Sequence, residues 1–419
     1  MLLADYLEAE WRPALGCTEP AAIAWAAATA ASVCDGPVRA VHLVCDPRTY
    51  KNCYAVGIPN SGRRTGILWS MALGALLPGP DRGLECFADL TPEIVDAAGR
   101  LVEAGGTTVD VETRREWLHI DCTVARAGGV GRAVIEREHS SLVRLERNGV
   151  TVEPGQAVRA AGEPGSVRQE LATLPIGALI DLARSAREAD RTVLREGAAR
   201  NIAIARHGLS LFPPRFVDTA HQDSLSRLSR LVCAGVHARM SGEPFVVMTL
   251  AGSGNKGITC AVPLTLWGRE SGVTDTRIDE ALALGCLVTS SVTHQLGSLS
   301  AACGAAIAAG LGVAAGLVLL EDGGADEIAL AMSNIVGNLT GMICDGAKIG
   351  CGLKTMTGID AAFRAASLAL AGIGIPATDG ILGHSPAETL VNLGRITTRG
   401  MAAMDTEILG IMQNKLRAR

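Results

Sequence analysis

Aromatic side chains are scarce in this sequence. Phenylalanine, tyrosine and tryptophan together make up 3% of its 419 residues, whereas hydrophobic residues as a whole make up 48% and 49 positions are glycine. A core with so few rings has to be filled mainly by alanine, valine, leucine and isoleucine. Because a well-packed interior leaves little empty space, such small side chains require close helix contacts. We therefore expect closely packed helices, which could also support a homodimer.

Clustered positive charge is missing as well. Charged residues make up 19% of the chain, the formal net charge is −5, and no long run carries one sign. A surface that binds nucleic acid needs grouped lysine and arginine, so we expect no nucleic-acid partner. The glycine-rich segment 252–257 lacks the Lys-Ser/Thr ending of a phosphate-binding loop, so it does not predict a P-loop.

Signals for secretion or for a membrane span are also lacking. The N-terminal residues MLLADYLEAEWRP are acidic, where a signal peptide would be basic. Residues 301–320 carry no charge, but they are mostly alanine and glycine, and a buried helix explains them better than a bilayer does. We expect a cytoplasmic protein without a membrane partner. The thiols of its twelve cysteines should then stay reduced.

Hydrophobic periodicity and turn residues indicate where helices and strands lie. Residues 1–35 are expected to be helical with a break at 16–20, and nearly everything beyond Leu174 is expected to be helical. Further elements are expected as helices at 67–77 and 91–104 and as strands at 38–44, 109–112, 117–124, 132–138 and 142–147. Asn148-Gly149 then predicts a hairpin turn.

The fold class that follows is α+β, with a large, mainly helical domain formed by both chain ends and a small α/β-type inserted module. We place the helical, catalytic domain at 1–85 and 166–419, and the small α+β module at 86–165.

Three cysteines in the C-terminal half are candidates for holding a metal centre. Cys344 and Cys351 bracket a glycine-rich turn, and Cys303 stands where a helix begins, a place that favours a thiolate. Three thiolates suit a [4Fe–4S] cluster with one iron left open, and an open iron can polarise a leaving group. A zinc site completed by Cys17 or His294, and plain packing of the cysteines, are the alternatives.

Motifs spread along nearly the whole chain carry a family resemblance. In order, they are Gly16-Cys17-Thr18-Glu19-Pro20, Lys51-Asn52, Val56-Gly57-Ile58-Pro59, the stretch 251–259, the Cys303 and Cys344–Cys351 elements, Asp379-Gly380-Ile381 and Asn392-Leu393-Gly394-Arg395-Ile396. Together they resemble the L-cysteine desulfidase family (the UPF0597 group), relatives of the iron–sulfur L-serine dehydratase α chain.

This resemblance implies a lyase that uses a [4Fe–4S] cluster and no pyridoxal phosphate. Its small-molecule amino-acid substrate would be L-cysteine, broken down to pyruvate, ammonia and sulfide, with Cys303, Cys344 and Cys351 as the cluster ligands. Members of the family usually have glutamine where this chain has Lys256, a departure that leaves the substrate open. Dehydration of L-serine or a related β-hydroxy amino acid is therefore the alternative. A non-enzymatic iron–sulfur or zinc protein is a third reading.

Elimination also needs a base for the α-proton and groups that hold the substrate. Lys348, between two of the cluster cysteines, is the first candidate base, followed by Cys17 and Lys51. Cys17 is alternatively a further cluster ligand, and Lys348 alternatively only balances the charge of the cluster. His139 is either a ligand-binding residue or an ordinary strand end. The expected substrate-binding residues are Thr18, Glu19, Asn52, Ser253, Gly254, Asn255 and Lys256.

Overall fold

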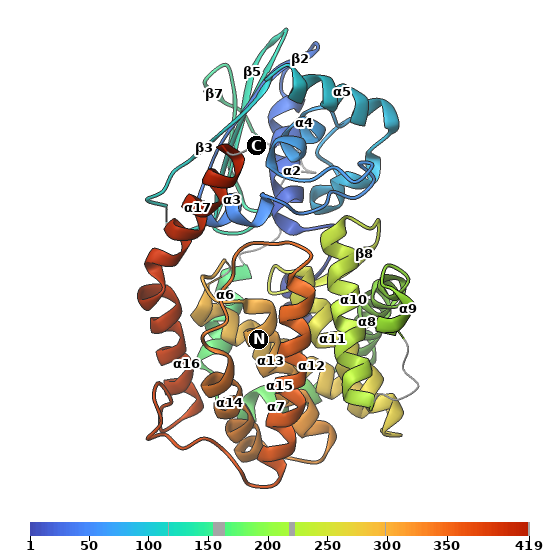
Figure 1. Cartoon of the computed structure of the whole chain (residues 1–419), viewed down its shortest axis with the longest axis vertical. Coiled ribbons are helices and arrows are strands. Elements are labelled where there is room, and N and C mark those ends of the chain that lie inside the picture. The colour runs from blue at the N-terminus through green and yellow to red at the C-terminus, as the bar shows by residue number, and fades with distance from the viewer. Residues whose placement is uncertain (116, 154–163, 218–222, 298, 418–419) are drawn as a thin grey trace.

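The computed structural model describes residues 1–115, 117–153, 164–217, 223–297 and 299–417. Figure 1 shows a sheet with its helices in the upper half and a group of helices in the lower half. The molecule is thus a mainly helical α+β protein, which confirms the fold class expected from the sequence.

The upper half contains a sheet that has six strands within the described residues, in the order β3-β2-β4-β5-β6-β7. β2 and β3 are parallel, and the other neighbouring pairs are antiparallel. Asn148 and Gly149 both have positive φ at the turn from β6 to β7, as the hairpin signal predicts. The strands are β2 (Val38–Cys45), β3 (Thr107–Val111), β4 (His119–Arg126), β5 (Gly129–Glu136), β6 (Leu142–Arg147) and β7 (Val150–Thr151).

Helix α2 (Thr18–Ser32) is buried beneath this sheet because it is built almost entirely of small residues. A Cβ added at Gly131 of β5 would come within 1.9 Å of the Ala30 carbonyl oxygen, and one added at Gly74 would come within 2.3 Å of the Ala24 carbonyl oxygen. The other helices of this half are α3 (Pro47–Cys53), α4 (Ile67–Ala75), the 3-10 helix η1 (Gly83–Asp89) and α5 (Pro92–Glu103).

The lower half is organised around α13 (Gly304–Leu320), from Ala306 onward a buried helix of alanine, glycine and large aliphatic residues. None of the described helices is long and apolar enough to cross a membrane. The helices that surround α13 or extend this half are α6 (Pro164–Thr173), α7 (Ile176–Arg184), α8 (Glu188–Leu209), α9 (Pro214–Val217), α10 (Ser224–Ser241), α11 (Gly254–Glu270), α12 (Asp275–Leu296), α14 (Ala325–Leu339), α15 (Cys351–Leu370) and α16 (Pro386–Arg395).

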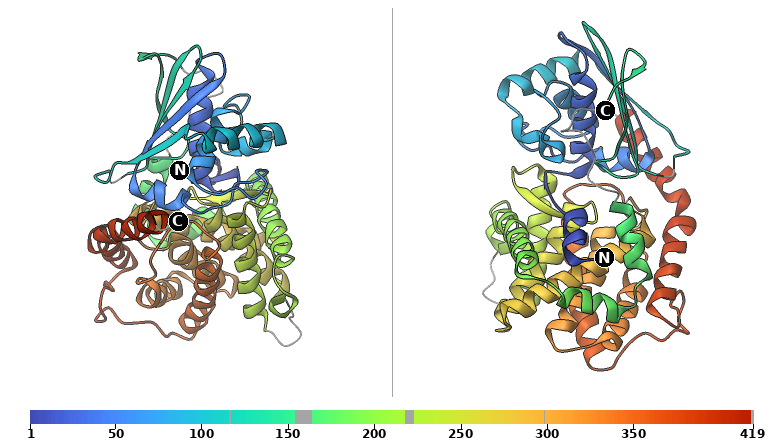
Figure 2. Two further views of the ribbon diagram at one scale, coloured as in Figure 1. Left: turned by 45° about the horizontal axis from the view of Figure 1, so that its top comes forward. Right: turned by 180° about the vertical axis from the view of Figure 1, so that it is seen from behind.

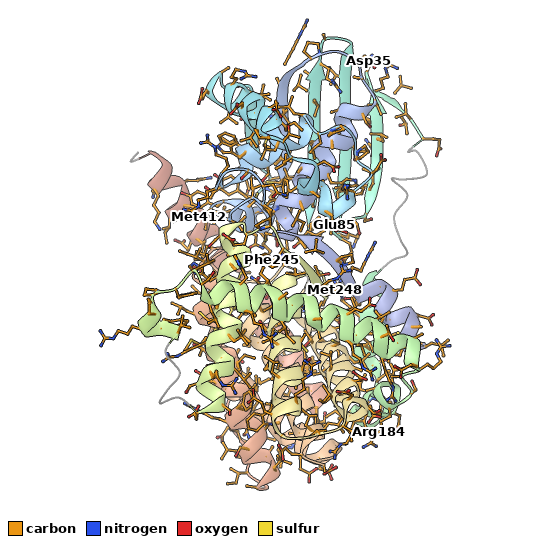
Figure 3. All side chains as sticks on the ribbon, turned by 90° about the vertical axis from the view of Figure 1, so that its right-hand side faces the viewer. Asp35, Glu85, Arg184, Phe245, Met248 and Met412 are labelled. Atoms are coloured by element: carbon orange, nitrogen blue, oxygen red, sulfur yellow. The ribbon has the colours of Figure 1, made fainter. Side chains whose placement is uncertain are left out.

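Both ends of the chain connect the two halves. Seen from behind in Figure 2, α1 (Leu3–Glu10) lies in the helical half, and the chain then enters the sheet half through α2. Between them β1 (Trp11–Leu15) pairs antiparallel with β8 (Val246–Leu250), which lies at the waist of the molecule near the labelled Phe245 and Met248 in Figure 3.

At the other end of the chain, a π-helix, η3 (Ile396–Gly400), leads into α17 (Ala402–Arg417). In Figure 1, α17 runs along the outside of the molecule towards α3. Asp405 of α17 forms ion pairs with Arg48 and Lys51 of α3, with N–O distances of 2.8 and 2.6 Å. The last described helix is therefore tied to the first half of the chain.

Two features differ from the sequence expectation. Residues 11–15, which were expected to be helical, form strand β1, and its partner β8 also lies in a region expected to be helical. The sheet also includes β2, which precedes the predicted 86–165 module, and residues 154–163 of that module lie outside the described residues. The division into domains stays a prediction.

Candidate active site

A cavity lies where the two halves of the molecule meet, and the space between its lining atoms amounts to about 690 Å³, part of it open to solvent. From the sheet half it receives residues at the start of α2, in α3 and in the loop between β5 and β6; from the helical half it receives the starts of α11, α13 and α15. Its polar lining includes Cys17, Thr18, Glu19, Asn52, His139, Arg239, Ser253, Asn255, Lys256, Ser300, Cys303, Cys344 and Cys351.

Within the described residues, four helices begin at this cavity: α2, α11, α13 and α15. Their N-cap residues are Cys17, Ser253, Cys303 and Gly350, and none of these four makes a side-chain capping hydrogen bond. The first N–H groups of a helix have no partner inside the helix, and they carry the positive end of its dipole. At α15 the N–H groups of Cys351 and Gly352 already donate to the carbonyls of Lys348 and Ile349, so the starts of α2, α11 and α13 are the ones that favour negative charge in the cavity.

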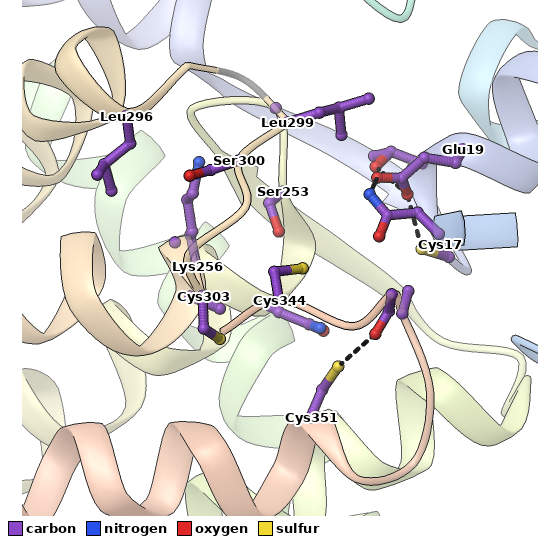
Figure 4. A pocket seen from close by; sticks show the side chains of 18 of the residues that line it. Cys17, Glu19, Ser253, Lys256, Leu296, Leu299, Ser300, Cys303, Cys344 and Cys351 are labelled. Carbon is purple, nitrogen blue, oxygen red and sulfur yellow. Dashed lines mark hydrogen bonds between the residues drawn. The ribbon is translucent and has the colours of Figure 1, made fainter. Parts of the chain in front are cut away.

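The three predicted cluster cysteines face this cavity from neighbouring loops. The Cys303 N–H donates to the Met342 carbonyl at 2.8 Å, and the Cys344 N–H donates to the Ala301 carbonyl at 2.7 Å. These reciprocal bonds join the segment before α13 to the segment before α15. The Cys351 thiol donates to the Gly346 carbonyl at 3.5 Å. Figure 4 shows all three thiols on one side of the cavity, with Cys17 and Glu19 on the other.

The three thiols lie close enough to influence one another electrostatically. Burial raises the pKa of Cys303 to about 12, and the charges of Cys344 and Cys351 add to the rise, so the three groups sense one another. Yet among the described residues no three His, Cys, Asp or Glu side chains are arranged to hold one metal ion. Cysteine thiolates are the ligands of iron–sulfur clusters, so the residue types present on this wall fit such a group.

A lysine pair balances this region. Asp345 is bound by Lys348 at 2.6 Å and by Lys354, which lies one helical turn after Cys351. Burial alone would raise the pKa of Asp345, but the hydrogen bonds from both lysines lower it to about 2. The charge of Lys354 also lowers the pKa of Cys303, against the larger effect of burial. Lys354, whose Nζ also donates to the Ile343 carbonyl at 2.8 Å, is thus a cation near the thiols that sequence reasoning missed.

On the opposite wall, Glu19 is the centre of a hydrogen-bonded group. Its Oε2 accepts from the Cys17 thiol at 2.9 Å, and its Oε1 accepts from the Asn52 amide at 3.1 Å. His139 Nε2 lies 3.9 Å from Oε1. Burial alone would raise the pKa of Glu19, but His139 and the Cys17 hydrogen bond lower it to about 2. Glu19 is therefore a buried carboxylate that stays ionised. Burial and this charge raise the pKa of Cys17 well above its usual value, so Cys17 stays a thiol.

Lys256 is the most strongly perturbed base in the cavity lining. Its side chain is buried at the start of α11, and its Nζ donates to the Ala251 carbonyl at 3.3 Å. Burial and the positive charge of Arg168 lower its pKa to about 8, although Glu10 and Glu138 act in the opposite direction. A Cβ added at Gly304 would come within 3.2 Å of the Lys256 side chain, so this lysine reaches the start of α13.

Of the residues predicted from the sequence, three do not line the cavity. Lys348 is held by Asp345 and by the carbonyls of residues 345 and 346. Lys51 is buried in its ion pair with Asp405, and it also donates to the Cys344 carbonyl at 2.7 Å. Gly254 instead packs against another side chain, since a Cβ there would lie 2.4 Å from Arg239 Nε. The remaining predicted residues all line the cavity.

Among the lining residues that were not chosen from the sequence, His139 and Arg239 carry side chains that can bear positive charge. His139 was treated as an undecided strand-end residue, and only the folding of the β5–β6 loop over α2 brings it to Glu19. Arg239 lies in the last turn of α10 and belongs to no motif of its own. Its Nη1 donates to the Asn255 side chain at 2.9 Å. Unlike His139, Arg239 had no sequence signal that could have marked it.

Comparison with known proteins gives the family. Residues 83–410 match the family model described as the serine dehydratase alpha chain. This chain belongs to the serine dehydratase alpha chain family. It is also 37% identical to a UPF0597 protein of Oleidesulfovibrio alaskensis, over 98% of this chain and 97% of that protein. A UPF0597 protein of Geobacter sulfurreducens is likewise 37% identical, over 98% of both chains.

Membership of the serine dehydratase alpha chain family indicates a lyase-type enzyme, because a dehydratase breaks its substrate by elimination. The matched region contains Cys303, Cys344, Cys351 and Lys256, whereas Cys17 and Glu19 precede it. The UPF0597 relatives span nearly the full length, so the α2 side of the cavity lies within the region shared with them. The family resemblance expected from the sequence motifs is thereby confirmed.

Proposed function

We propose that this protein is a [4Fe–4S]-dependent lyase that eliminates the β-substituent of a small amino acid, with L-cysteine converted to pyruvate, ammonia and sulfide. The observation that carries the proposal is the convergence of Cys303, Cys344 and Cys351 on one cavity with a buried, ionised Glu19 opposite. Three thiolates would hold the cluster. When bound, the cluster would supply a Lewis-acidic iron for the thiol or hydroxyl that leaves.

The polar residues of the cavity are complementary to the other two charges of an amino acid. Glu19 is a negative group suited to the α-ammonium, and Asn52 fixes its orientation through the 3.1 Å hydrogen bond. Ser253 and the free amides at the start of α11 suit the α-carboxylate, since helix N-termini bind anions. An amino acid held at both ends would place its Cβ substituent towards the three cysteines.

Lys256 is the group that supports removal of the α-proton. A general base works best when its pKa is near the working pH, and the pKa of Lys256 is lowered to about 8. Cys17, the other candidate in the cavity, is a thiol already bonded to Glu19. In the elimination, the Cα–H electrons form the Cα–Cβ double bond, the bond to the β-substituent breaks and Lys256 takes the proton. The enamine product then hydrolyses to the keto acid and ammonia.

L-Serine is the second candidate substrate. The family description favours it, because the matching model is that of a serine dehydratase. The same cavity groups would bind either amino acid, since the two substrates differ only in the atom attached to Cβ, sulfur or oxygen. The choice between sulfur and oxygen therefore depends on the metal centre rather than on the groups that hold the backbone of the amino acid.

The test is purification without oxygen, followed by measurement of iron, acid-labile sulfide and activity. The protein should contain about four iron atoms per chain and absorb broadly near ~400 nm. L-Cysteine should yield sulfide, pyruvate and ammonia in equal amounts, and L-serine is assayed in parallel.

Paired serine substitutions locate the cluster. Cys303→Ser should lose iron and activity together, whereas Cys34→Ser, at another buried cysteine outside the cavity, should retain both. A colourless protein that binds one zinc ion would refute the proposal. If an iron-loaded protein converts L-serine but not L-cysteine, the proposed elimination reaction is retained and L-serine replaces L-cysteine as the substrate.

A further inference from the structure

Arg239 is a buried cation without a counter-ion among the described residues. Its side chain is 1% exposed, and its Nε and Nη2 have no hydrogen-bond partner in the part of the chain that the structure describes. Only Nη1 is engaged, through the 2.9 Å bond to the Asn255 side chain. A buried charge is costly unless it is paired, so an arginine in this state requires an explanation.

The position of the Arg239 guanidinium suggests why it has no counter-ion among the described residues. Arg239 lies against the first turn of α11, where a Cβ on Gly254 would approach its Nε to 2.4 Å, so glycine is needed for the fit. Asn255, in the same turn, holds Nη1 and thereby fixes the plane of the group. Nε and Nη2 point the same way along one edge of a guanidinium, the geometry that matches the two oxygens of a carboxylate.

We propose that Arg239, together with the N-terminus of α11, binds the α-carboxylate of the substrate. This inference rests on the proposed function for the identity of the substrate, and it adds the residue that selects amino acids over amines. Asn255 is the positioning residue, because it acts through Arg239. The carboxylate would supply the negative charge that the buried guanidinium lacks, and Ser253 and the free amides of α11 would share it.

The groups around Arg239 argue against an internal partner. The Cys17 thiol senses the charge of Arg239, but this thiol donates its proton to Glu19 and is neutral. Glu19 itself is already bonded to Cys17 and Asn52. Within the described residues, no carboxylate forms an ion pair with Arg239. Within the described residues the site therefore lacks an anion, and the substrate carboxylate would supply one.

Binding of unreactive substrate analogues tests this assignment. L-Alanine has the carboxylate and ammonium groups but no leaving group, and L-alaninamide lacks the carboxylate charge. Calorimetric titration of the anaerobic, cluster-containing protein should show L-alanine binding about 10- to 100-fold more tightly, the effect of one charge-assisted hydrogen-bonded pair. Arg239→Gln should reduce this preference at least about tenfold, and Arg239→Lys should keep part of it.

Arg227→Gln is the matched control, because Arg227 lies on the same helix and pairs with Glu270 outside the cavity. It should leave the preference for L-alanine unchanged. Equal binding of both analogues by the unsubstituted protein would overturn the inference, even if Arg239→Gln failed to fold. So would a preference that survives in a folded Arg239→Gln protein.

The outcomes also separate this inference from the proposed function. If L-alanine binds in an Arg239-dependent way while neither L-cysteine nor L-serine is converted, the carboxylate site stands and the reaction is wrong. If L-cysteine is converted while both analogues bind equally well, the reaction stands and Arg239 has another role.

Discussion

The pH dependence of turnover offers a direct test of Lys256. As a proton acceptor, Lys256 must be neutral, and burial together with Arg168 lowers its pKa to about 8. At pH 7 about one lysine in eleven would then be neutral, and at pH 9 about ten in eleven. We therefore expect kcat/KM for L-cysteine to rise roughly tenfold between these two pH values.

Substitution of Lys256 should remove this rise. Lys256→Gln keeps a polar side chain of similar length but cannot take a proton, so kcat should fall by about 10²–10⁴ and the dependence near pH 8 should disappear. Lys415→Gln, at an exposed lysine of α17, is the control and should leave the profile unchanged. The assay follows pyruvate formation by anaerobic protein across pH 6.5–9.5, a range chosen to bracket the pKa of about 8.

The lowered pKa of Lys256 should also make the free energy of unfolding depend on pH, independently of catalysis. Below about pH 8 the folded protein carries a charged lysine that burial disfavours, whereas the unfolded chain titrates only near 10.5. Lys256→Met should therefore increase the free energy of unfolding, and this increase should become smaller by roughly 2–3 kcal/mol between pH 7 and pH 10. Urea denaturation of both proteins at each pH measures the difference.

Two results would refute the reasoning about Lys256. A gain in stability from Lys256→Met that is the same at pH 7 and pH 10 would mean that burial does not lower the pKa. A Lys256→Gln protein with unchanged kcat would show that another group takes the α-proton, and Cys17 would then be the remaining candidate that lines the cavity.

Three further substitutions test other parts of the structure. Glu19→Gln should raise the KM for L-cysteine about tenfold or more with a smaller change in kcat, because the ammonium loses a charged partner. Asp405→Asn should lower the free energy of unfolding by about 3–5 kcal/mol in urea denaturation, since it leaves the buried Lys51 charge unpaired. Gly74→Ala should cost about 1–3 kcal/mol in thermal unfolding, because its Cβ would lie 2.3 Å from the Ala24 oxygen; an unchanged melting temperature would contradict that close contact.

Local patterns predicted the elements that depend on nearby residues. The alternation at 117–124 and 132–138 and the turn at Asn148-Gly149 correspond to β4, β5 and the β6–β7 hairpin. β1 and β8 were missed because neither is stable alone. β1 contains Pro13, and its pairing joins Trp11 to Leu250, so the strand exists only after the rest of the chain has folded.

Some residues of the candidate site could likewise be predicted from local sequence, and others could not. Cysteine spacing and motif order singled out Cys303, Cys344 and Cys351, and all three line the cavity, while their role as cluster ligands stays a prediction. Spacing alone did not show which lysine, Lys348 or Lys354, lies near the thiols. The turn at 345–350 directs Lys348 to Asp345 and its neighbouring carbonyls, outside the cavity lining. Arg239 was invisible in the sequence, since only its missing partners distinguish it from other buried arginines.

The two walls of the cavity come from different parts of the chain, and this has a consequence for how selectivity can change. Cys303 and Cys344 lie in the loops before α13 and α15, and Cys351 is the first residue of α15. Glu19, Asn52 and His139 belong instead to α2, α3 and the β5–β6 loop. Substitutions in the second group can alter how the α-ammonium group is held without changing the segments that carry the three cysteines. A laboratory search for substrates with an altered amino group should therefore begin on that wall.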